Sequence, residues 1–430
     1  MTGSDSQELH DAIDAVWRIE QARLIAALAR MTGDVGRAED LAQDALLAAL
    51  EQWPASGVPN KPGAWLMTAA KRRLIDQRRH GEMAERKHQE IGRDADARGE
   101  DMEDALVAAL DDHVGDDLLR LVFATCHPVL STDARVALTL RLLGGLTTGE
   151  IARAFLVQES TISQRIVRAK RTLSEARVPL EVPRGEALTA RTASVLEVIY
   201  LIFNEGYSAT AGEDLVRPAL CEDALRLGRI VAELMPQEPE VHGLVALMEI
   251  QASRLRARVN ASGEPVLLLD QDRSRWDAVL IRRGLAALGR AESLGQALGP
   301  YALQAAIAAC HARSRLASET DWMRISALYD ALSQVMPSPV VELNRAVAVM
   351  MAFGPAAGLE LVDALVASGA LKEYHLLYSV RGDFLAKLGR LDEARVEFER
   401  AASMTRNERE RALMRERAAA CLRLTGGGTG

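Results

Sequence analysis

The sequence predicts an all-α protein, for two reasons. Only 4% of the 430 residues are aromatic, whereas Ala, Leu and Arg are abundant throughout. Aromatic residues favour strands, and Ala, Leu and Arg are strong helix formers. Several segments also place apolar residues three and four positions apart, as on the buried face of a helix. With 48% hydrophobic residues, the chain can bury sizeable cores, and its length predicts roughly two to four domains.

The N-terminal segment 33–53, GDVGRAEDLAQDALLAALEQW, predicts a helix with one apolar and one acidic face. Leu41, Ala45, Ala48 and Ala49 can pack inward. The outward face carries Asp40, Gln43, Asp44 and Glu51. Such a face can dock on a basic protein, or it can simply be solvated.

A loop and a basic helix follow. The loop PASGVPNKPG, 54–63, contains three prolines and two glycines. The helix 64–80 carries five Lys or Arg residues against one Asp, a net charge of +4. These cations suit a phosphate backbone, and the loop can hold an unstacked base. The candidate DNA-contacting residues of this helix are Trp65, Lys71, Arg72, Arg73, Arg78 and Arg79.

The next segment is acidic, although the segment beyond it is basic again. Residues 81–104 hold nine acidic and four basic residues and almost no large apolar ones, which predicts a solvated linker over 83–112. Residues 141–177 carry seven basic and three acidic residues, a net charge of +4. The overall charge of −8 argues against a chain that coats nucleic acid as a whole, but these patches can contact it locally.

The segment LTTGEIARAFLVQESTISQRIVRAKRTL, 146–173, predicts two short helices around a tight turn near 156–158. Thr147 and Glu150 form a T-x-x-E capping box at the start of the first helix. A buried stripe on the second helix has the spacing i, i+4, i+7, i+11 and consists of Ile162, Ile166, Ala169 and Leu173.

The second helix leaves its polar residues facing outward. They are Ser160, Thr161, Gln164, Arg165, Arg168 and Arg171. A helix with this face can enter a major groove and contact bases and phosphates. The alternative is a solvated basic face on an ordinary helical hairpin.

The order of these parts resembles the sigma-70 family of bacterial transcription initiation factors. The matching motifs are DLAQDAL at 40–46, P-x-A-W-L-x-T-A-A-K-R-R-L-I-D at 62–76 and S-x-R-I-x-R-A-K-R at 163–171. They are most similar to the extracytoplasmic-function (ECF) type, which keeps only regions 2 and 4. The resemblance implies two small helical domains, 10–82 and 113–178, joined by the acidic linker.

The resemblance also implies roles and partners. Asp40, Gln43 and Asp44 match the helix that binds the β′ clamp helices of core RNA polymerase, and the β flap is a second expected contact. The loop and the basic helix match the part that recognises and opens the −10 promoter element. The outward residues of the second helix in 146–173 match the −35 recognition helix. Relatives carry more aromatic residues near the melting loop, whereas only Trp53 and Trp65 flank it here.

The remaining segment, 185–424, predicts a larger domain of helical hairpins. AELMPQEPEVHGLVALM, 232–248, and SQVMPSPVVELNRAVAVMM, 333–351, share a Met-Pro pair about 101 residues apart. Ala394 and Phe398 are placed like the small and bulky residues of a tetratricopeptide repeat. Stacked repeats of this kind usually bind a peptide or protein on a concave face, whereas an irregular helical domain has no such groove.

This layout resembles sigma factors that carry a tetratricopeptide-like extension. VIYLIFNEGYSA at 198–209 and LLLDQDRSRWD at 267–277 are similar to signature segments of that extension. The resemblance implies that the extension controls activity, either by itself or through a regulatory protein or ligand. Polar groups in these segments could line a pocket, but such groups more often satisfy helix ends. They are Asn204, Glu205, Tyr207, Asp270, Asp272 and Arg273.

Other function classes are less consistent with the sequence. The N-terminus lacks a signal-peptide pattern, and the longest uncharged stretch, 293–312, is interrupted by Gly, Pro and His residues, so we expect a cytoplasmic protein without a membrane span. Neither a nucleophile elbow nor a phosphate-binding glycine loop occurs, so we expect no enzymatic activity and no cofactor.

The cysteine and histidine residues show no metal-ligand spacing. The cysteines lie roughly 90 to 110 residues apart, and we expect them to be buried, reduced thiols. They are Cys126, Cys221, Cys310 and Cys421. The histidines His127, His242, His311 and His375 also lack metal-ligand spacing. We therefore expect no metal site.

Two alternatives to a sigma factor remain at this point. A regulator of the LuxR type shares a similar T-x-x-E-I-A motif, but it lacks the DLAQDAL and AWLMTAAKRRLID segments. A repeat scaffold that only binds proteins requires neither basic patch.

Overall fold

The regular structure of the protein is helical. The computed structural model describes residues 3–86, 114–208, 216–260, 264–295, 297–405 and 407–426. No strand forms among these residues, which confirms the all-α prediction. Internal contacts divide the chain into two units, Met1–Ile199 and Tyr200–Gly430, here called unit 1 and unit 2.

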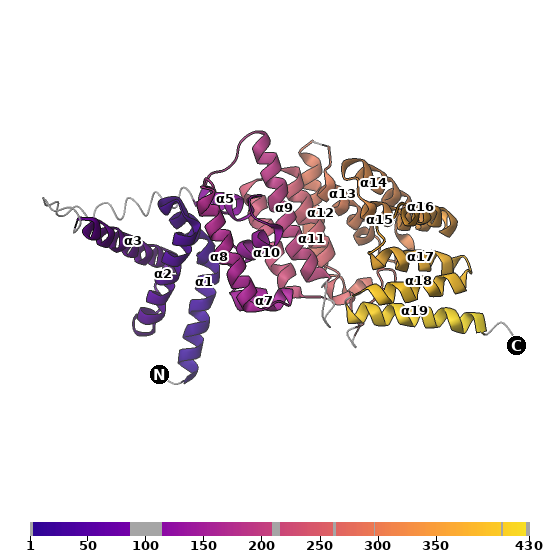
Figure 1. Ribbon diagram of the computed structural model, residues 1–430, viewed down its shortest axis with the longest axis horizontal. Helices are drawn as coiled ribbons and strands as arrows, with labels where there is room; N and C mark the ends of the chain where they lie inside the picture. Colours follow the sequence, from indigo (N-terminus) through magenta and orange to yellow (C-terminus); the bar gives the residue numbers. More distant parts are fainter. Residues whose placement is uncertain are drawn as a thin grey trace. The chain divides into compact units, whose positions relative to one another are not determined.

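Unit 1 contains two groups of helices followed by the first part of α9 (Figure 1). The Asp34 carboxylate caps α2 by accepting a hydrogen bond from the Arg37 amide at 2.8 Å, and Ser131 caps α6 in the same way. The helices are α1 (Gly3–Thr32), α2 (Val35–Ser56), α3 (Pro62–Arg86), α5 (Val114–Thr125), α6 (Thr132–Leu142), α7 (Thr148–Phe155), α8 (Glu159–Glu175) and α9 (Glu186–Tyr207).

The connection between α2 and α3 is shorter than the predicted loop 54–63. Helix α2 continues through Pro54 to Ser56, and Gly57 then ends it at φ 79° with its amide bonded to the Trp53 carbonyl. Because Pro54 lies close to the end of the helix, its missing amide disturbs little of the hydrogen-bond ladder. Helix α3 already begins at Pro62, a residue type suited to a first helical turn.

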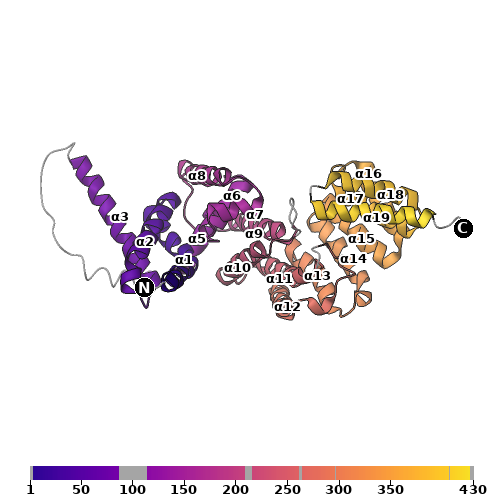
Figure 2. The ribbon, with the colours of Figure 1, turned by 90° about the horizontal axis from the view of Figure 1, so that it is seen from below.

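Unit 2 consists of successive helices that pack as hairpins, and α17, α18 and α19 lie side by side in both views (Figure 1 and Figure 2). After the second part of α9, its α-helices are α10 (Pro218–Leu234), α11 (Pro239–Ala252), α12 (Ala278–Ser293), α13 (Pro300–Arg313), α14 (Trp322–Val335), α15 (Pro339–Phe353), α16 (Pro355–Ser368), α17 (His375–Lys387), α18 (Leu391–Met404) and α19 (Glu408–Gly426). The short 3-10 helices are η1 (Leu255–Ala257), η2 (Arg273–Arg275) and η3 (Ala317–Glu319).

The two Met-Pro pairs found in the sequence form equivalent turns. Met235 ends α10 with φ −128° and ψ 61°, and Met336 ends α14 with φ −135° and ψ 75°. In each case a second proline, Pro239 or Pro339, starts the next helix. The sequence repeat therefore corresponds to a repeated hairpin connection.

Small residues allow the last hairpin to close tightly. Ala394 and Phe398 of α18 are buried, as their spacing predicts. A Cβ atom on Gly382 of α17 would meet carbon atoms of the Phe398 ring at 2.9 to 3.1 Å. The absence of a side chain at Gly382 therefore lets the ring pack directly against α17.

The cysteines are all buried and unbridged, as predicted. Burial raises the pKa of the Cys126 and Cys310 thiols, and it raises that of Cys221 to about 12. Within the described ranges, no helix combines the length and apolar character needed to cross a membrane.

Candidate functional site

Helix α2 presents the predicted acidic face. Asp40 is exposed, while Asp44 is half-buried and forms an ion pair with Arg73 of α3 at 3.3 Å. On the opposite face, Leu41, Ala45 and Ala49 are buried as predicted, whereas the predicted inward residue Ala48 is only half-buried. The surface available to a protein partner is therefore centred on Asp40 and Asp44.

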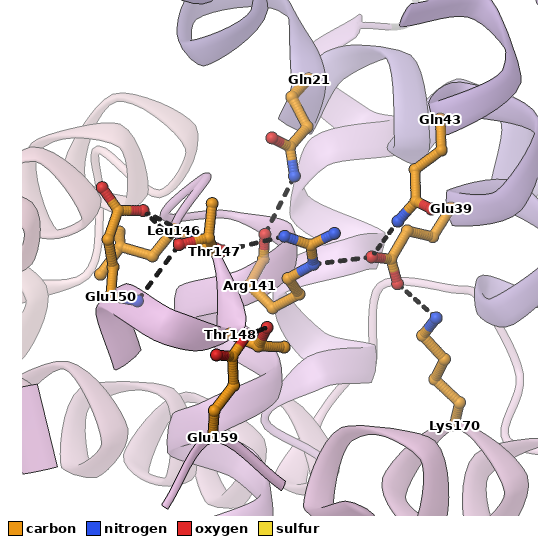
Figure 3. A network of polar contacts seen from close by, with 10 residues as sticks. All are labelled: Gln21, Glu39, Gln43, Arg141, Leu146, Thr147, Thr148, Glu150, Glu159 and Lys170. Atoms are coloured by element: carbon orange, nitrogen blue, oxygen red, sulfur yellow. Dashed lines mark hydrogen bonds and ion pairs between the residues drawn. The ribbon is translucent and has the colours of Figure 1, made fainter. Parts of the chain in front are cut away.

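The third predicted residue of this face, Gln43, contacts a buried carboxylate that sequence reasoning missed. Its Nε2 donates to Glu39 Oε1 at 2.9 Å. Glu39 is only 2% exposed and also accepts a hydrogen bond from Arg141 Nε at 2.8 Å, while Lys170 forms an ion pair with its other oxygen (Figure 3). Because Glu39 precedes the buried residue Ala42 by three positions, it lies on the apolar face of α2, where a carboxylate requires a cation.

Further polar contacts join the two helical groups of unit 1, which are α1–α3 and α5–α8. Gln21 of α1 donates to the Arg141 carbonyl of α6 at 3.0 Å (Figure 3). Arg141 also donates to the Leu146 carbonyl, within its own group. Asp117 of α5, 2% exposed, forms ion pairs with Arg30 of α1 at 2.9 Å and with Arg120 at 3.1 Å. Two buried carboxylates are thus each held by two cations.

Helices α7 and α8 form the predicted pair around a tight turn. The Glu150 amide donates to Thr147 Oγ1 at 3.1 Å and the Thr147 amide donates to Glu150 Oε2 at 2.8 Å, which confirms the capping box. Leu156 makes the turn in the left-handed conformation, at φ 51°. Burial alone would raise the pKa of the Glu150 carboxyl, but the hydrogen bonds from Thr147 and the nearby Arg18 and Arg153 lower it.

The outward residues of α8 lie where the sequence places them. The stripe Ile162, Ile166, Ala169 and Leu173 is buried, as predicted. Ser160, Gln164, Arg168 and Arg171 are exposed, and Thr161 and Arg165 are half-buried.

Two of the α8 arginines contact acidic residues. Arg165 forms an ion pair with Asp133 at 3.0 Å, and Arg171 with Glu175 at 3.4 Å. The carboxylates of Asp133 and Glu175 are 66% and 67% exposed, so water screens both pairs and phosphates can compete for these arginines.

The candidate −10 residues lie along α3. The Trp65 ring stacks edge-on against the buried Trp53 ring, with 5.3 Å between centroids and 63° between planes. Arg72 and Arg73 are exposed, and Lys71 is half-buried. Arg78 and Arg79 belong to α3, but their side chains lie outside the described residues, as do residues 87–112 of the predicted linker.

The candidate polymerase and DNA surfaces meet at one hollow of about 510 Å³. Asp40 of α2 lines it together with Lys170 and Arg171 of α8. The acidic surface of α2 and the basic surface of α8 are therefore neighbours in unit 1, and their opposite charges attract each other.

Two of the six polar groups noted in the first half of the extension, Asp272 and Arg273, satisfy helix ends. Glu205 forms an ion pair with Arg217, and Asp272 caps η2 through the Ser274 amide. Arg273 donates to the carbonyls of His311 and Ser314. In the described part of the chain, no three His, Cys, Asp or Glu side chains gather as a metal site requires.

Comparisons with known protein families match three parts of the chain. Residues 16–82 match the model of sigma-70 region 2, and residues 120–173 match that of sigma-70 region 4. Residues 191–292 match a family of unknown function, DUF6596.

Individual relatives match either most of the chain or a part of it. An uncharacterized protein of Rhizobium meliloti (strain 1021) is 42% identical over 404 residues, which cover 94% of each chain. The probable ECF RNA polymerase sigma factor SigI of Mycobacterium tuberculosis (strain ATCC 25618 / H37Rv) is 31% identical over 175 residues, 40% of this chain and 58% of SigI. The ECF RNA polymerase sigma factor SigL of Mycobacterium tuberculosis (strain ATCC 35801 / TMC 107 / Erdman) is 30% identical over 148 residues, 34% of this chain and 76% of SigL.

The fold of unit 1 and the matches to regions 2 and 4 define a transcription initiation factor of the sigma-70 class. The match that spans most of SigL places the chain in the ECF family of RNA polymerase sigma factors. Members of this class are initiation factors and not enzymes. The region 2 match also accounts for the N-terminal segments that the LuxR-type alternative leaves unexplained.

Proposed function

We propose that this sigma factor binds core RNA polymerase through α2, contacts the −10 element through the 57–61 connection and α3, and contacts the −35 element through α8. In this proposal residues 10–82 and 113–178 are the two sigma domains, joined by the acidic linker 83–112. The tetratricopeptide-like extension, 185–424, controls their activity.

The observation that carries the proposal is the division of α8 into two faces. Four apolar residues anchor the helix against the rest of unit 1, and Leu156, in the left-handed conformation, makes the turn that joins α7 to α8. Polar side chains remain exposed from the first turn, at Ser160, to the last turns, at Arg171. A major groove accepts such a helix, with side chains of the early turns near base edges and arginines near phosphates.

The −35 contact is tested by run-off transcription with bacterial core polymerase and a promoter library. We expect Arg168→Ala to reduce promoter use without reducing core binding, because the exposed Arg168 has no acidic neighbour in an ion pair within the described residues. Loss of a base contact costs about 1 to 3 kcal/mol, and loss of a phosphate contact lowers the salt dependence of binding. Arg165→Ala is expected to act in the same direction.

Arg23→Ala is the matched control, because Arg23 is an exposed arginine on α1 and its loss changes the net charge equally. Wild-type transcription by Arg168→Ala and Arg165→Ala at every salt concentration would show that α8 does not contact the promoter.

The polymerase contact is tested by Asp44→Arg. We expect this change to abolish co-purification with core enzyme while helicity is retained, because Asp44 is accessible and its only described ion pair, with Arg73, is an exposed one. Asp14→Arg is the control, since it makes the same charge change at an exposed position of another helix, α1. Equal core affinity of the two variants would contradict the assigned role of α2.

Control by the extension is tested with two truncations, after residue 180 and after residue 208. The longer one keeps α9, whose Arg191 donates to the Phe123 carbonyl and whose Ser194 donates to the Cys126 carbonyl. Higher transcription than the full chain means that the extension inhibits, and lower transcription means that it is required. Unchanged transcription and promoter choice by the 1–208 chain would rule out a controlling role.

A further inference from the structure

A cavity of about 370 Å³ lies within unit 2, and its size suits a small molecule. The residues around η1 and the following segment 265–271 form one wall, and α17 and α19 form the other. Tyr207 also lines it. Residues 191–292, which match the family of unknown function, therefore share this cavity with the last helices of the chain.

The cavity wall contains two arginines that form no ion pair with a described carboxylate. Arg254 is only 8% exposed, so its guanidinium is buried in the folded chain. Within the described ranges no carboxylate pairs with Arg254 or Arg258, and neither Nε atom has a hydrogen-bond acceptor. Burying a cation without a compensating anion is costly. An anion that enters the cavity would remove this cost.

Aromatic rings hold these arginines in place but do not neutralise them. The Arg258 guanidinium lies 3.9 Å from the centre of the Tyr207 ring. The Arg254 guanidinium lies 5.9 Å from the Tyr207 ring centre and 5.8 Å from that of Trp276. Such cation–π contacts orient a guanidinium while leaving its N–H groups available.

The other charged groups of the cavity wall are already engaged. Glu410, the single carboxylate that lines the described cavity, accepts a hydrogen bond from Thr405 Oγ1 at 2.8 Å and lies 3.2 Å from His375 Nε2. Arg417 forms an ion pair with Asp383. Burial alone would raise the pKa of the Glu410 carboxyl, but His375, Thr405 and the charge of Arg258 lower it. Arg258 therefore has a distant counter-charge, whereas the buried Arg254 has none among the described residues of the cavity wall.

A buried acceptor and an apolar surface complete the wall. Gln271 is 7% exposed; its Nε2 donates to the Val266 carbonyl at 3.2 Å, and its Oε1 has no donor in the part of the chain that the structure describes. Leu268, Leu413 and Met414 also line the cavity. These groups suit a ligand that has a hydrogen-bond donor and an apolar body.

We propose that this cavity binds an anionic small molecule, a carboxylate or a phosphate ester, with Arg254 and Arg258 on the anion and Gln271 Oε1 on a donor group. The inference goes beyond the proposed promoter and polymerase contacts, because it concerns only residues of unit 2. Its test requires neither polymerase nor DNA, so the two proposals can fail independently.

The test is calorimetric titration of the full chain with matched probes. 4-Hydroxybenzoate carries an anion, an apolar ring and a donor, benzoate lacks the donor, 4-hydroxybenzamide lacks the charge, and phenyl phosphate offers the other anion. We expect saturable binding of 4-hydroxybenzoate or phenyl phosphate. The loss of charge should weaken affinity about tenfold or more, and the loss of the donor should weaken it by a smaller factor.

Variants assign the binding to the cavity. We expect Arg254→Gln to weaken the binding of the charged probe about tenfold or more. Arg345→Gln is the control and should leave binding unchanged, because Arg345 pairs with Asp330 and Glu342 elsewhere in unit 2.

A second variant separates binding from folding. Without probe, Arg254→Met should melt at the same temperature as wild type or higher, since it removes an uncompensated buried charge. The proposal is wrong if neither anion saturates below about 10 mM, the upper end of weak binding. It is also wrong if the neutral amide binds equally well, or if Arg254→Gln binds like wild type.

Discussion

The two units bury charged side chains in different ways. In unit 1, the carboxylates of Glu39 and Asp117 are each enclosed by two cations. In unit 2, the Arg254 guanidinium is enclosed by aromatic rings and has no described carboxylate beside it. Both arrangements remove a charge from water, but only the first compensates it inside the protein.

This difference separates a structural role from a binding role. A compensated buried charge joins segments that are distant in sequence, as Glu39 joins α2 to α6 and α8. An uncompensated one leaves part of its interaction free energy for a ligand. We therefore expect Glu39→Gln in unit 1 to lower the free energy of unfolding. Arg254→Met in unit 2 should leave it nearly unchanged or raise it.

The largest effect is expected from Glu39→Gln. The change leaves Arg141 and Lys170 facing a neutral group, and removing one member of a buried charge cluster costs about 3 kcal/mol. Hydrogen exchange read by mass spectrometry should therefore accelerate in peptides from α2 and α8. Peptides from unit 2 should exchange as in wild type.

Asp40→Asn provides the control for Glu39→Gln, because Asp40 is the next residue on α2 but is exposed. Asp40→Asn should change the free energy of unfolding by no more than about 0.5 kcal/mol. Equal protection of α2 and α8 in Glu39→Gln and Asp40→Asn would show that the Glu39 cluster does not join the two helical groups.

The sequence predicted the elements that depend on local interactions. The capping box of Thr147 and Glu150 and the buried stripe of α8 follow from spacings of three and four residues, so they can be identified without a structure. The Met-Pro turns at Met235 and Met336 are predictable for the same reason. The family's division into regions 2 and 4 followed from the order of motifs.

The features that sequence reasoning missed depend on residues distant in the chain. Glu39 and Arg141 are 102 positions apart, and nothing near either residue indicates the pair. The cavity of unit 2 combines Arg254 with α17 and α19, far along the sequence. The predicted loop 54–63 is too long, because the helix continues through Pro54 and ends at Gly57.

A smaller loss of stability is expected from Gly382→Ala. This variant tests whether close apolar packing stabilises unit 2, in contrast to the buried ion pairs of unit 1. The new Cβ would meet the Phe398 ring at 2.9 to 3.1 Å, so the ring or one of the two helices would have to shift. Overpacking of this kind costs about 2 kcal/mol. Thermal unfolding of the full chain should show a lower melting temperature for this variant.

Gly289→Ala in α12 is the matched control for Gly382→Ala. No atom lies within 4 Å of the Cβ it would add, so the helix should gain about 0.5 to 1 kcal/mol from the replacement of glycine. If both alanine variants stabilise the chain, close packing at Phe398 does not limit unit 2.

The smallest effect concerns a half-buried charge in unit 1, the Glu150 carboxylate of the capping box. Its pKa is lowered in the folded chain, so its contribution to stability is present at neutral pH and is lost as the pH falls through that lowered value. We expect Glu150→Gln to reduce the protection of α7 amides by about 1 kcal/mol at pH 7. The difference from wild type, compared at each pH by hydrogen exchange, should shrink under acid conditions, because wild-type Glu150 is then protonated too. A difference that stays constant to acid pH would mean that the charge of the Glu150 carboxylate does not stabilise α7.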